Sequence, residues 1–251
     1  MFYDSHSHLD LMEKNDLSNA LKQAKENNIA KIVSCSTSFP SNEKNLELAR
    51  QYSQIMPAIG LYPLNAIELT ETEIEKAFHF FNSQIKKASA IGEVGLDFKY
   101  STKKEEQEKQ QQIFTKFIQL AKKNNKPLII HSRFAQKQAL ETLKENNAEK
   151  VLLHSFVDSE KLMKQASSMN YFISVGLSLL HNPLIQKNIT SFPIENLLFE
   201  TDSPVKFNNE QSAPKNITQI AEKISELKKT PLKEIEEKQQ KNFKKLFNTQ
   251  T

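Results

Sequence analysis

The chain has 251 residues, of which 38% are hydrophobic and 25% charged, and a formal net charge of +4. This composition excludes a disordered chain, and no stretch approaches the roughly 18 uninterrupted apolar residues of a membrane helix. The single Cys35 excludes a disulfide framework or a cysteine-built metal cluster, while the mildly basic charge permits a polyanionic partner without arguing for one.

Short apolar, β-branched runs alternate with longer amphipathic segments along the whole sequence. We predict eight strands, at residues 2–6, 31–36, 55–60, 90–94, 127–131, 150–154, 171–175 and 196–201. Each is followed by a segment with helical periodicity, for example at residues 42–52, 72–87, 103–124, 135–146, 159–168 and 216–229.

A repeated strand–helix unit implies parallel strands with helical crossovers. We therefore predict the α/β class, as one TIM barrel, (β/α)₈, with an additional C-terminal helix at residues 232–247 that packs on the outside. A doubly wound open sheet is the alternative architecture. No linker or low-complexity tract divides the chain, so residues 1–251 are expected to form a single domain.

The first strand carries titratable residues at alternate positions, Asp4, His6 and His8. Alternate residues of a strand face the same side, so all three are expected to point into the barrel mouth. Two imidazoles at this spacing can share a metal ion, and Asp4 could orient one of them by accepting a hydrogen bond.

Further candidate ligands stand at the ends of other predicted strands. Glu93 lies in the apolar fourth strand, where a carboxylate is costly to bury unless it is paired or binds a cation. His131 and His154 end the fifth and sixth strands, and Asp202 follows the eighth. Because active sites of parallel barrels lie at these strand ends, a metal site is the best explanation of the whole set.

These residue types suit two divalent ions. Glu93 is central in strand order and could bridge them, with His6, His8 and Asp202 on one ion. His131 and His154 would then hold the other. Glu93 and Asp202 are the candidate catalytic residues, Asp202 as the general base for the attacking water. No serine or cysteine nucleophile with a supporting histidine and acid is evident.

With these residues in place, the chain resembles the TatD-family deoxyribonucleases, a branch of the metal-dependent amidohydrolase-like barrels, over essentially its full length. The motifs that carry the resemblance are residues 4–9 (DSHSHL), 92–98 (GEVGLDF), 130–133 (IHSR), 154–156 (HSF), 200–204 (ETDSP) and 242–247 (NFKKLF).

The resemblance implies a metal-dependent DNase, usually an exonuclease acting on single-stranded DNA. It also implies that the metal ligands are His6, His8, Glu93, His131, His154 and Asp202. Arg133 is similar to a family position and suits a phosphate contact, or alternatively an ion pair with an acid at the barrel mouth.

The chain departs from the family pattern at two positions. Tyr62 stands where the family usually has histidine, and we expect it to bind substrate by a hydrogen bond or by stacking. Phe134 stands where an acid usually follows the arginine, which could loosen Arg133. Phe134 itself, Phe98 and Phe156 are further candidates for stacking on a base, or for the core.

Other properties stay open at this stage. Four imidazoles favour zinc or manganese, whereas the family is usually described as magnesium-dependent. The same site could serve a small-molecule amide, ester or phosphoester hydrolase, or a protein that retains metal without turnover. The start of the sequence lacks the pattern of a signal peptide, so we expect a cytoplasmic protein that needs no membrane and no obligate protein partner.

Overall fold

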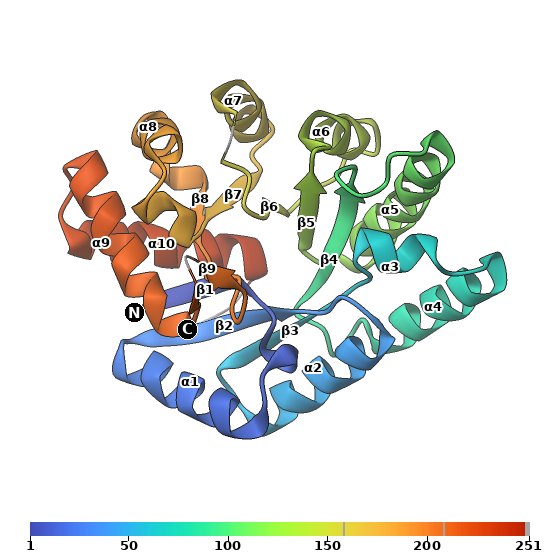
Figure 1. Cartoon of the computed structure of the whole chain (residues 1–251), viewed down its shortest axis with the longest axis horizontal. Coiled ribbons are helices and arrows are strands. Elements are labelled where there is room, and N and C mark those ends of the chain that lie inside the picture. Colours follow the sequence, from blue (N-terminus) through green and yellow to red (C-terminus); the bar gives the residue numbers. More distant parts are fainter. Residues whose placement is uncertain (158, 208, 249–251) are drawn as a thin grey trace.

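The computed structural model describes residues 1–157, 159–207 and 209–248. Eight parallel strands form one sheet in the order in which they occur along the chain (Figure 1). They are β1 (Phe2–Ser7), β2 (Ile29–Cys35), β3 (Ile55–Ile59), β4 (Ala90–Asp97), β5 (Leu128–Arg133), β6 (Val151–Leu153), β7 (Phe172–Val175) and β8 (Leu197–Phe199). A doubly wound sheet would reverse its strand order midway, so the barrel prediction is confirmed.

The helices surround these strands (Figure 1). They are α1 (Lys14–Glu26), α2 (Phe39–Gln51), α3 (Pro63–Ile67), α4 (Glu71–Gln84), α5 (Lys104–Asn124), α6 (Gln136–Glu145), α7 (Glu160–Ser168), α8 (Pro183–Ser191), α9 (Ile217–Lys228) and α10 (Leu232–Phe247). A short antiparallel pair, β9 (Lys206–Phe207) and β10 (Glu210–Gln211), follows β8. None of the helices in the described ranges is long and apolar enough to cross a membrane.

The barrel closes between β8 and β1 through individual hydrogen bonds rather than through a regular ladder. The Ser5 hydroxyl donates to the Phe199 carbonyl at 2.8 Å, and the Asp202 amide donates to the His6 carbonyl at 3.0 Å. The His8 amide reaches the Ser203 carbonyl at 2.6 Å. These contacts place the loop after β8 directly beside the end of β1.

The strands have one hydrophobic cluster on the outer side of the barrel and another on the inner side. The outer cluster joins the strands to the surrounding helices, whereas the inner one contains residues from each of the eight strands. Three residues of α10, namely Phe243, Leu246 and Phe247, belong to the inner cluster. The predicted additional helix is present and packs against β1, β8 and α9, but the expectation that it lies only on the outside is incomplete, because these three side chains extend into the inner cluster.

A β-bulge in β1 decides which of its side chains face inward. The strand advances three residues between Asp4 and Ser7 while β2 advances two. An extra residue reverses the alternation of side chains along a strand. Tyr3 faces the inner cluster before the bulge, and after it His6 and His8 face inward while Asp4 does not.

The same device recurs in β4. This strand advances three residues from Ile91 to Val94 while β5 advances two. Ala90 faces the inner cluster, so unbroken alternation would turn Val94 inward and Glu93 outward. With the bulge, Val94 packs in the outer cluster and the carboxylate of Glu93 points into the barrel.

The packing of α10 predicts a large effect of one substitution. Phe243 is fully buried, with ring centroids 4.5 Å from both Tyr3 and Phe247. Phe243→Ala should lower the free energy of unfolding in urea by about 3–5 kcal/mol, since it opens a cavity in the inner cluster. Leu232→Ala, at an exposed position of the same helix, is the control and should cost less than about 0.5 kcal/mol. Equal losses would contradict this packing.

Candidate metal centre

Six predicted ligands meet at the carboxyl ends of the strands. His6 lies in β1, Glu93 in β4 and His131 in β5. His8 and His154 directly follow β1 and β6, and Asp202 lies three residues after the end of β8. All except His6 line a pocket of about 600 Å³. His6 is fully buried beneath them.

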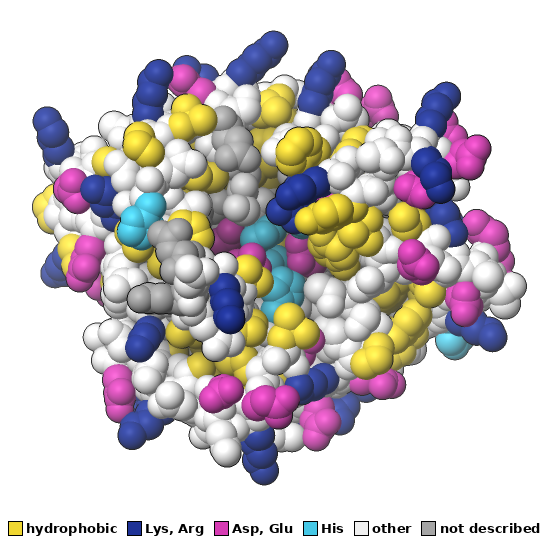
Figure 2. Space-filling model, viewed as in Figure 1, with side chains coloured by type: hydrophobic (Ala, Val, Ile, Leu, Met, Phe, Trp, Pro, Cys, Tyr) yellow, Lys and Arg dark blue, Asp and Glu magenta, His cyan; other side chains and the backbone are white. Residues whose placement is uncertain are grey.

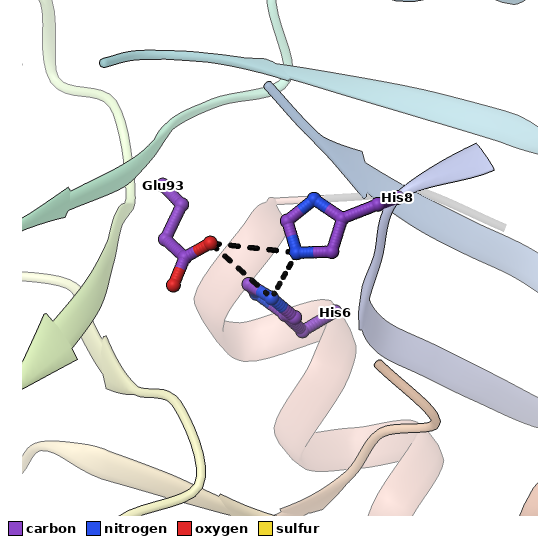
Figure 3. A group of neighbouring side chains, drawn as sticks. All are labelled: His6, His8 and Glu93. Atoms are coloured by element: carbon purple, nitrogen blue, oxygen red, sulfur yellow. Dashed lines mark hydrogen bonds and ion pairs between the residues drawn. The ribbon is translucent and has the colours of Figure 1, made fainter. Parts of the chain in front are cut away.

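Four atoms of this set lie close together, with an oxygen of Glu93 and one of Asp202 each facing the Nε2 atoms of His6 and His8. The Nε2 atoms of His6 and His8 lie 3.2 Å apart (Figure 3). Glu93 Oε2 lies 3.8 and 3.4 Å from these two nitrogens, and Asp202 Oδ1 lies 3.4 and 3.3 Å from them. Ligand atoms at the four corners of a tetrahedral ion are roughly 3.4 Å apart, given bonds of about 2.1 Å. The residues present therefore fit a divalent cation.

The second oxygen of Glu93 faces a different histidine. Glu93 Oε1 lies 2.6 Å from His131 Nδ1, and ligand atoms of Glu93, His131 and His154 all lie within 4.8 Å of one another. The His154 ring stacks on that of His6 with centroids 3.7 Å apart. The two oxygens of Glu93 thus connect two groups of histidines, as a bridging carboxylate would.

Other side chains fix the histidine rings from behind. His154 Nδ1 lies 2.8 Å from Glu200, which also accepts a hydrogen bond from the Ser174 hydroxyl. His131 Nε2 lies 3.1 Å from Asp97. The contact with Glu200 leaves His154 Nε2 for a metal, whereas His131 has an acid at each ring nitrogen, Asp97 at Nε2 and Glu93 at Nδ1.

Asp97 and Glu200 were missed in the sequence, although both stand within the motifs. Each occupies a position that alternation places on the inward side, Asp97 four residues after Glu93 and Glu200 two before Asp202. Counting alternate positions outward from the predicted ligands would have found both.

The role expected of Asp4 is wrong. Its carboxylate accepts from the Thr201 hydroxyl at 2.5 Å and from the backbone amides of Thr201 and His6 at 3.1 and 3.3 Å. No imidazole is among its partners in the described ranges, and His6 Nδ1 has none there either. The β1 bulge explains the difference because it turns Asp4 away from the side that His6 and His8 share. Asp4 instead joins β1 to the segment after β8.

The electrostatics of the centre follow from burying acids and imidazoles together. Burial alone would raise the pKa of Glu93, but His131, His6 and His8 hold it well below its ordinary range. Burial alone would lower the pKa of His8, but Asp202 and Glu93 raise it to about 9. Glu200 likewise outweighs burial and raises the pKa of His154 to about 10. Without metal, the acids of the centre are ionised and these two histidines are protonated.

The two predicted substrate-binding residues lie at the pocket wall. Arg133 makes no ion pair with any acid of the described ranges within 4 Å, which leaves its guanidinium for another anion. The Tyr62 hydroxyl donates to Asp97 at 2.6 Å, and its ring meets that of His131 edge-on at 4.8 Å. Tyr62 therefore contacts the acid that holds a candidate ligand.

The sequence matches the TatD-related DNase family over residues 3–248. It is 32% identical to an uncharacterised metal-dependent hydrolase of Bacillus subtilis, YabD, over 98% of this chain and 99% of the relative. It is 31% identical to the human deoxyribonuclease TATDN3, over 97% of this chain and 93% of the relative. Among solved structures, the Escherichia coli TatD homologue YjjV is similar with a TM-score of 0.89 and 26% identity, covering 99% of this chain and 98% of that one.

The contact between His154 and Glu200 predicts a loss of metal affinity. Glu200→Gln removes the charge that orients the ring and raises its basicity, so affinity for zinc or manganese should fall by about 10- to 100-fold. Titration of the metal-stripped protein against a chelating dye measures this. Glu195→Gln, at an exposed acid paired with Lys238, is the control and should change nothing. Equal affinities for Glu200→Gln and wild type would rule out the orienting role.

The raised pKa values predict proton release on metal binding. His8 and His154, with pKa values of about 9 and 10 against an ordinary 6.5, are protonated at pH 7 and must lose a proton to bind metal. The apparent affinity should therefore rise with pH between 7 and 10, with on the order of two protons released per chain at pH 7. Calorimetry in buffers of different ionisation enthalpy counts these protons. An affinity independent of pH over this range would contradict the electrostatics.

Proposed function

Because the chain belongs to the TatD-related DNase family, we propose that this metal-dependent hydrolase cleaves phosphodiester bonds of DNA, and of single-stranded ends in particular. The observation that carries the proposal is the convergence of four histidines and two carboxylates at the floor of one pocket. This donor set suits divalent ions, and a hydrolase built on such ions needs no covalent nucleophile.

We propose that the centre holds two ions. His6, His8 and Asp202, whose facing atoms lie 3.2 to 3.4 Å apart, would hold one. His131 and His154 would hold the other. Glu93 would contact both, because its Oε2 faces the first group of histidines and its Oε1 faces His131. When bound, such a pair would polarise the phosphodiester and lower the pKa of water.

The protein's own groups divide the remaining work between them. The guanidinium of Arg133 binds the phosphate, since its planar fork matches two phosphate oxygens. Asp202 accepts the proton of the attacking water: its Oδ1 lies at the centre, and about a third of its side chain is exposed to the pocket. The Tyr62 hydroxyl, by donating to Asp97, steadies the acid that holds His131.

The shape of the pocket favours a strand end as substrate. The candidate ligands lie at the bottom of a cavity of about 600 Å³, the size range of sites that enclose a small ligand. A terminal nucleotide of a single strand is small enough to enter a cavity of this volume, so we propose an unpaired end as the substrate. Contacts to phosphate carry no sequence information, so cleavage should be largely independent of sequence.

The identity of the ions is proposed from the donors. Four imidazoles bind zinc or manganese more tightly than magnesium, which prefers oxygen ligands and octahedral geometry. Manganese suits the mixture of nitrogen and oxygen donors. The cytoplasmic location stays a prediction from the sequence.

Metal-dependent cleavage of end-labelled single-stranded DNA tests the proposal. Metal-stripped protein should be inactive, and addition of manganese, zinc or magnesium should restore stepwise shortening of the strand. Glu93→Gln removes the negative charge that lies between the two groups of histidines, so kcat should fall by on the order of 100-fold or more. Glu226→Gln, at an exposed acid paired with Lys223, is the matched control.

The same assay separates the other candidate activities. Parallel reactions contain p-nitrophenyl esters and a bis-aryl phosphodiester in place of DNA. Hydrolysis of carboxylic esters with intact DNA would contradict the nuclease proposal and favour a small-molecule hydrolase on the same centre. A folded, metal-loaded protein without turnover on any substrate would favour a protein that only retains metal.

A further inference from the structure

A strongly exposed aromatic ring stands beside the pocket. Phe134 directly follows Arg133 at the end of β5 and is 71% exposed, the highest value among the large hydrophobic residues of the described ranges that reach the surface. A single exposed hydrophobic side chain is common on protein surfaces, whereas a group of exposed rings beside a pocket marks a binding surface. Figure 2 shows hydrophobic and basic side chains beside the histidines in the hollow of this face.

The backbone of Phe134 argues against a structural reason for the ring. Its φ is +56°, a left-handed conformation that bulky residues rarely adopt and that asparagine or glycine tolerates. The turn itself is anchored by Ala135, which is fully buried at the start of α6. Phenylalanine here has an unfavourable backbone and gains no burial, so stability does not explain its presence.

Tyr100 supplies a second exposed ring near Arg133. Tyr100, which follows β4, is 57% exposed, and the guanidinium carbon of Arg133 lies 5.5 Å from its ring centroid. Lys99 Nζ lies 5.3 Å from the same ring. The two strand ends are held together because the Phe98 amide donates to the Arg133 carbonyl at 2.9 Å. A cation–π contact with Tyr100 thus orients Arg133 at a site where the adjacent position is occupied by Phe134 rather than by an acid.

We propose that Phe134 is the platform of a nucleobase-binding subsite at the rim of the pocket. Resting on the proposed DNase function, the assignment places an unpaired base on the Phe134 ring, next to the phosphate that Arg133 binds. Tyr100 is a positioning residue that holds the guanidinium toward the pocket. The basic groups Arg133 and Lys99 complement the charge of the nucleic acid backbone. Every base has a π face, so the subsite accepts all four bases, and only when they are unpaired.

A double-mutant cycle tests the subsite by removing the Phe134 ring from the protein, a base from the substrate, or both. Phe134→Ala should lower kcat/KM on single-stranded oligonucleotides by roughly 5- to 100-fold, the range found for one stacked base. The substrates carry an abasic residue at each of the first positions from the cleaved end in turn. At one position the abasic residue should lower the kcat/KM of the wild type by a similar factor. On that abasic substrate the kcat/KM of Phe134→Ala should equal that of the wild type. If Phe134→Ala lowers kcat/KM by the same factor on normal strands and on abasic strands at every position, the subsite is wrong.

Two further variants distinguish a base platform from a packing residue. Phe134→Trp keeps a π face and should retain activity on DNA close to that of the wild type. Phe134→Asn should raise the midpoint of thermal unfolding, because asparagine tolerates the left-handed backbone, while it lowers kcat/KM on DNA. A lowered midpoint, or a changed sedimentation coefficient, would assign the ring to packing or to contact with a second copy and would overturn the proposal. Leu184→Ala, at an exposed position of α8, is the matched control.

Failure of the subsite and failure of the proposed function give different results. If the wild type cleaves no oligonucleotide but hydrolyses esters, both the nuclease function and the subsite are wrong. If the wild type cleaves DNA and Phe134→Ala cleaves it equally well, only the subsite is wrong.

Discussion

The buried carboxylate of Glu93 is the group on which the arrangement of the centre depends. An isolated charge inside an apolar barrel is costly, and it is stable only when opposite charges or cations surround it. Glu93 has histidines on both sides, His6 and His8 toward one oxygen and His131 toward the other. Protons on imidazole and divalent cations can balance the same negative charge. Protons and divalent cations therefore compete for the same histidines, and we expect metal binding to depend on pH.

Two local irregularities put these groups in place. The bulges of β1 and β4 reverse the alternation of side chains, and they lie in the strands that carry His6, His8 and Glu93. At the other end of the barrel, α10 completes the inner cluster with Phe243, Leu246 and Phe247. The side chains of α10 thus fill one end of the barrel, and the candidate ligands lie at the other, where the strands have their carboxyl ends. Parallel barrels commonly show this division. Substitutions in α10 should act on stability, and those at the strand ends on metal and substrate binding.

Much of this could be predicted from the sequence, because the strand–helix rhythm and the titratable strand ends are local patterns. The eight strands and the six converging side chains were predicted, and so was the extent of α10. The direction of single side chains and the packing of the last helix were harder to predict. The side to which Asp4 turns depends on a bulge, and the packing of α10 depends on which end of the barrel is open. Neither leaves a periodic trace in the sequence. Likewise, Phe156 is buried in the core whereas Phe134 is exposed, although both lie two or three residues after a candidate histidine ligand.

The number of metal ions bound per chain tests the central claim most directly. Native mass spectrometry of the manganese-loaded protein, and of Glu93→Ala prepared in the same way, would count them. The account predicts two ions in the wild type, because the oxygens of Glu93 face two groups of histidines, and a loss of at least one in the variant. A wild type with one ion or none, or a Glu93→Ala variant that still binds two, would contradict it.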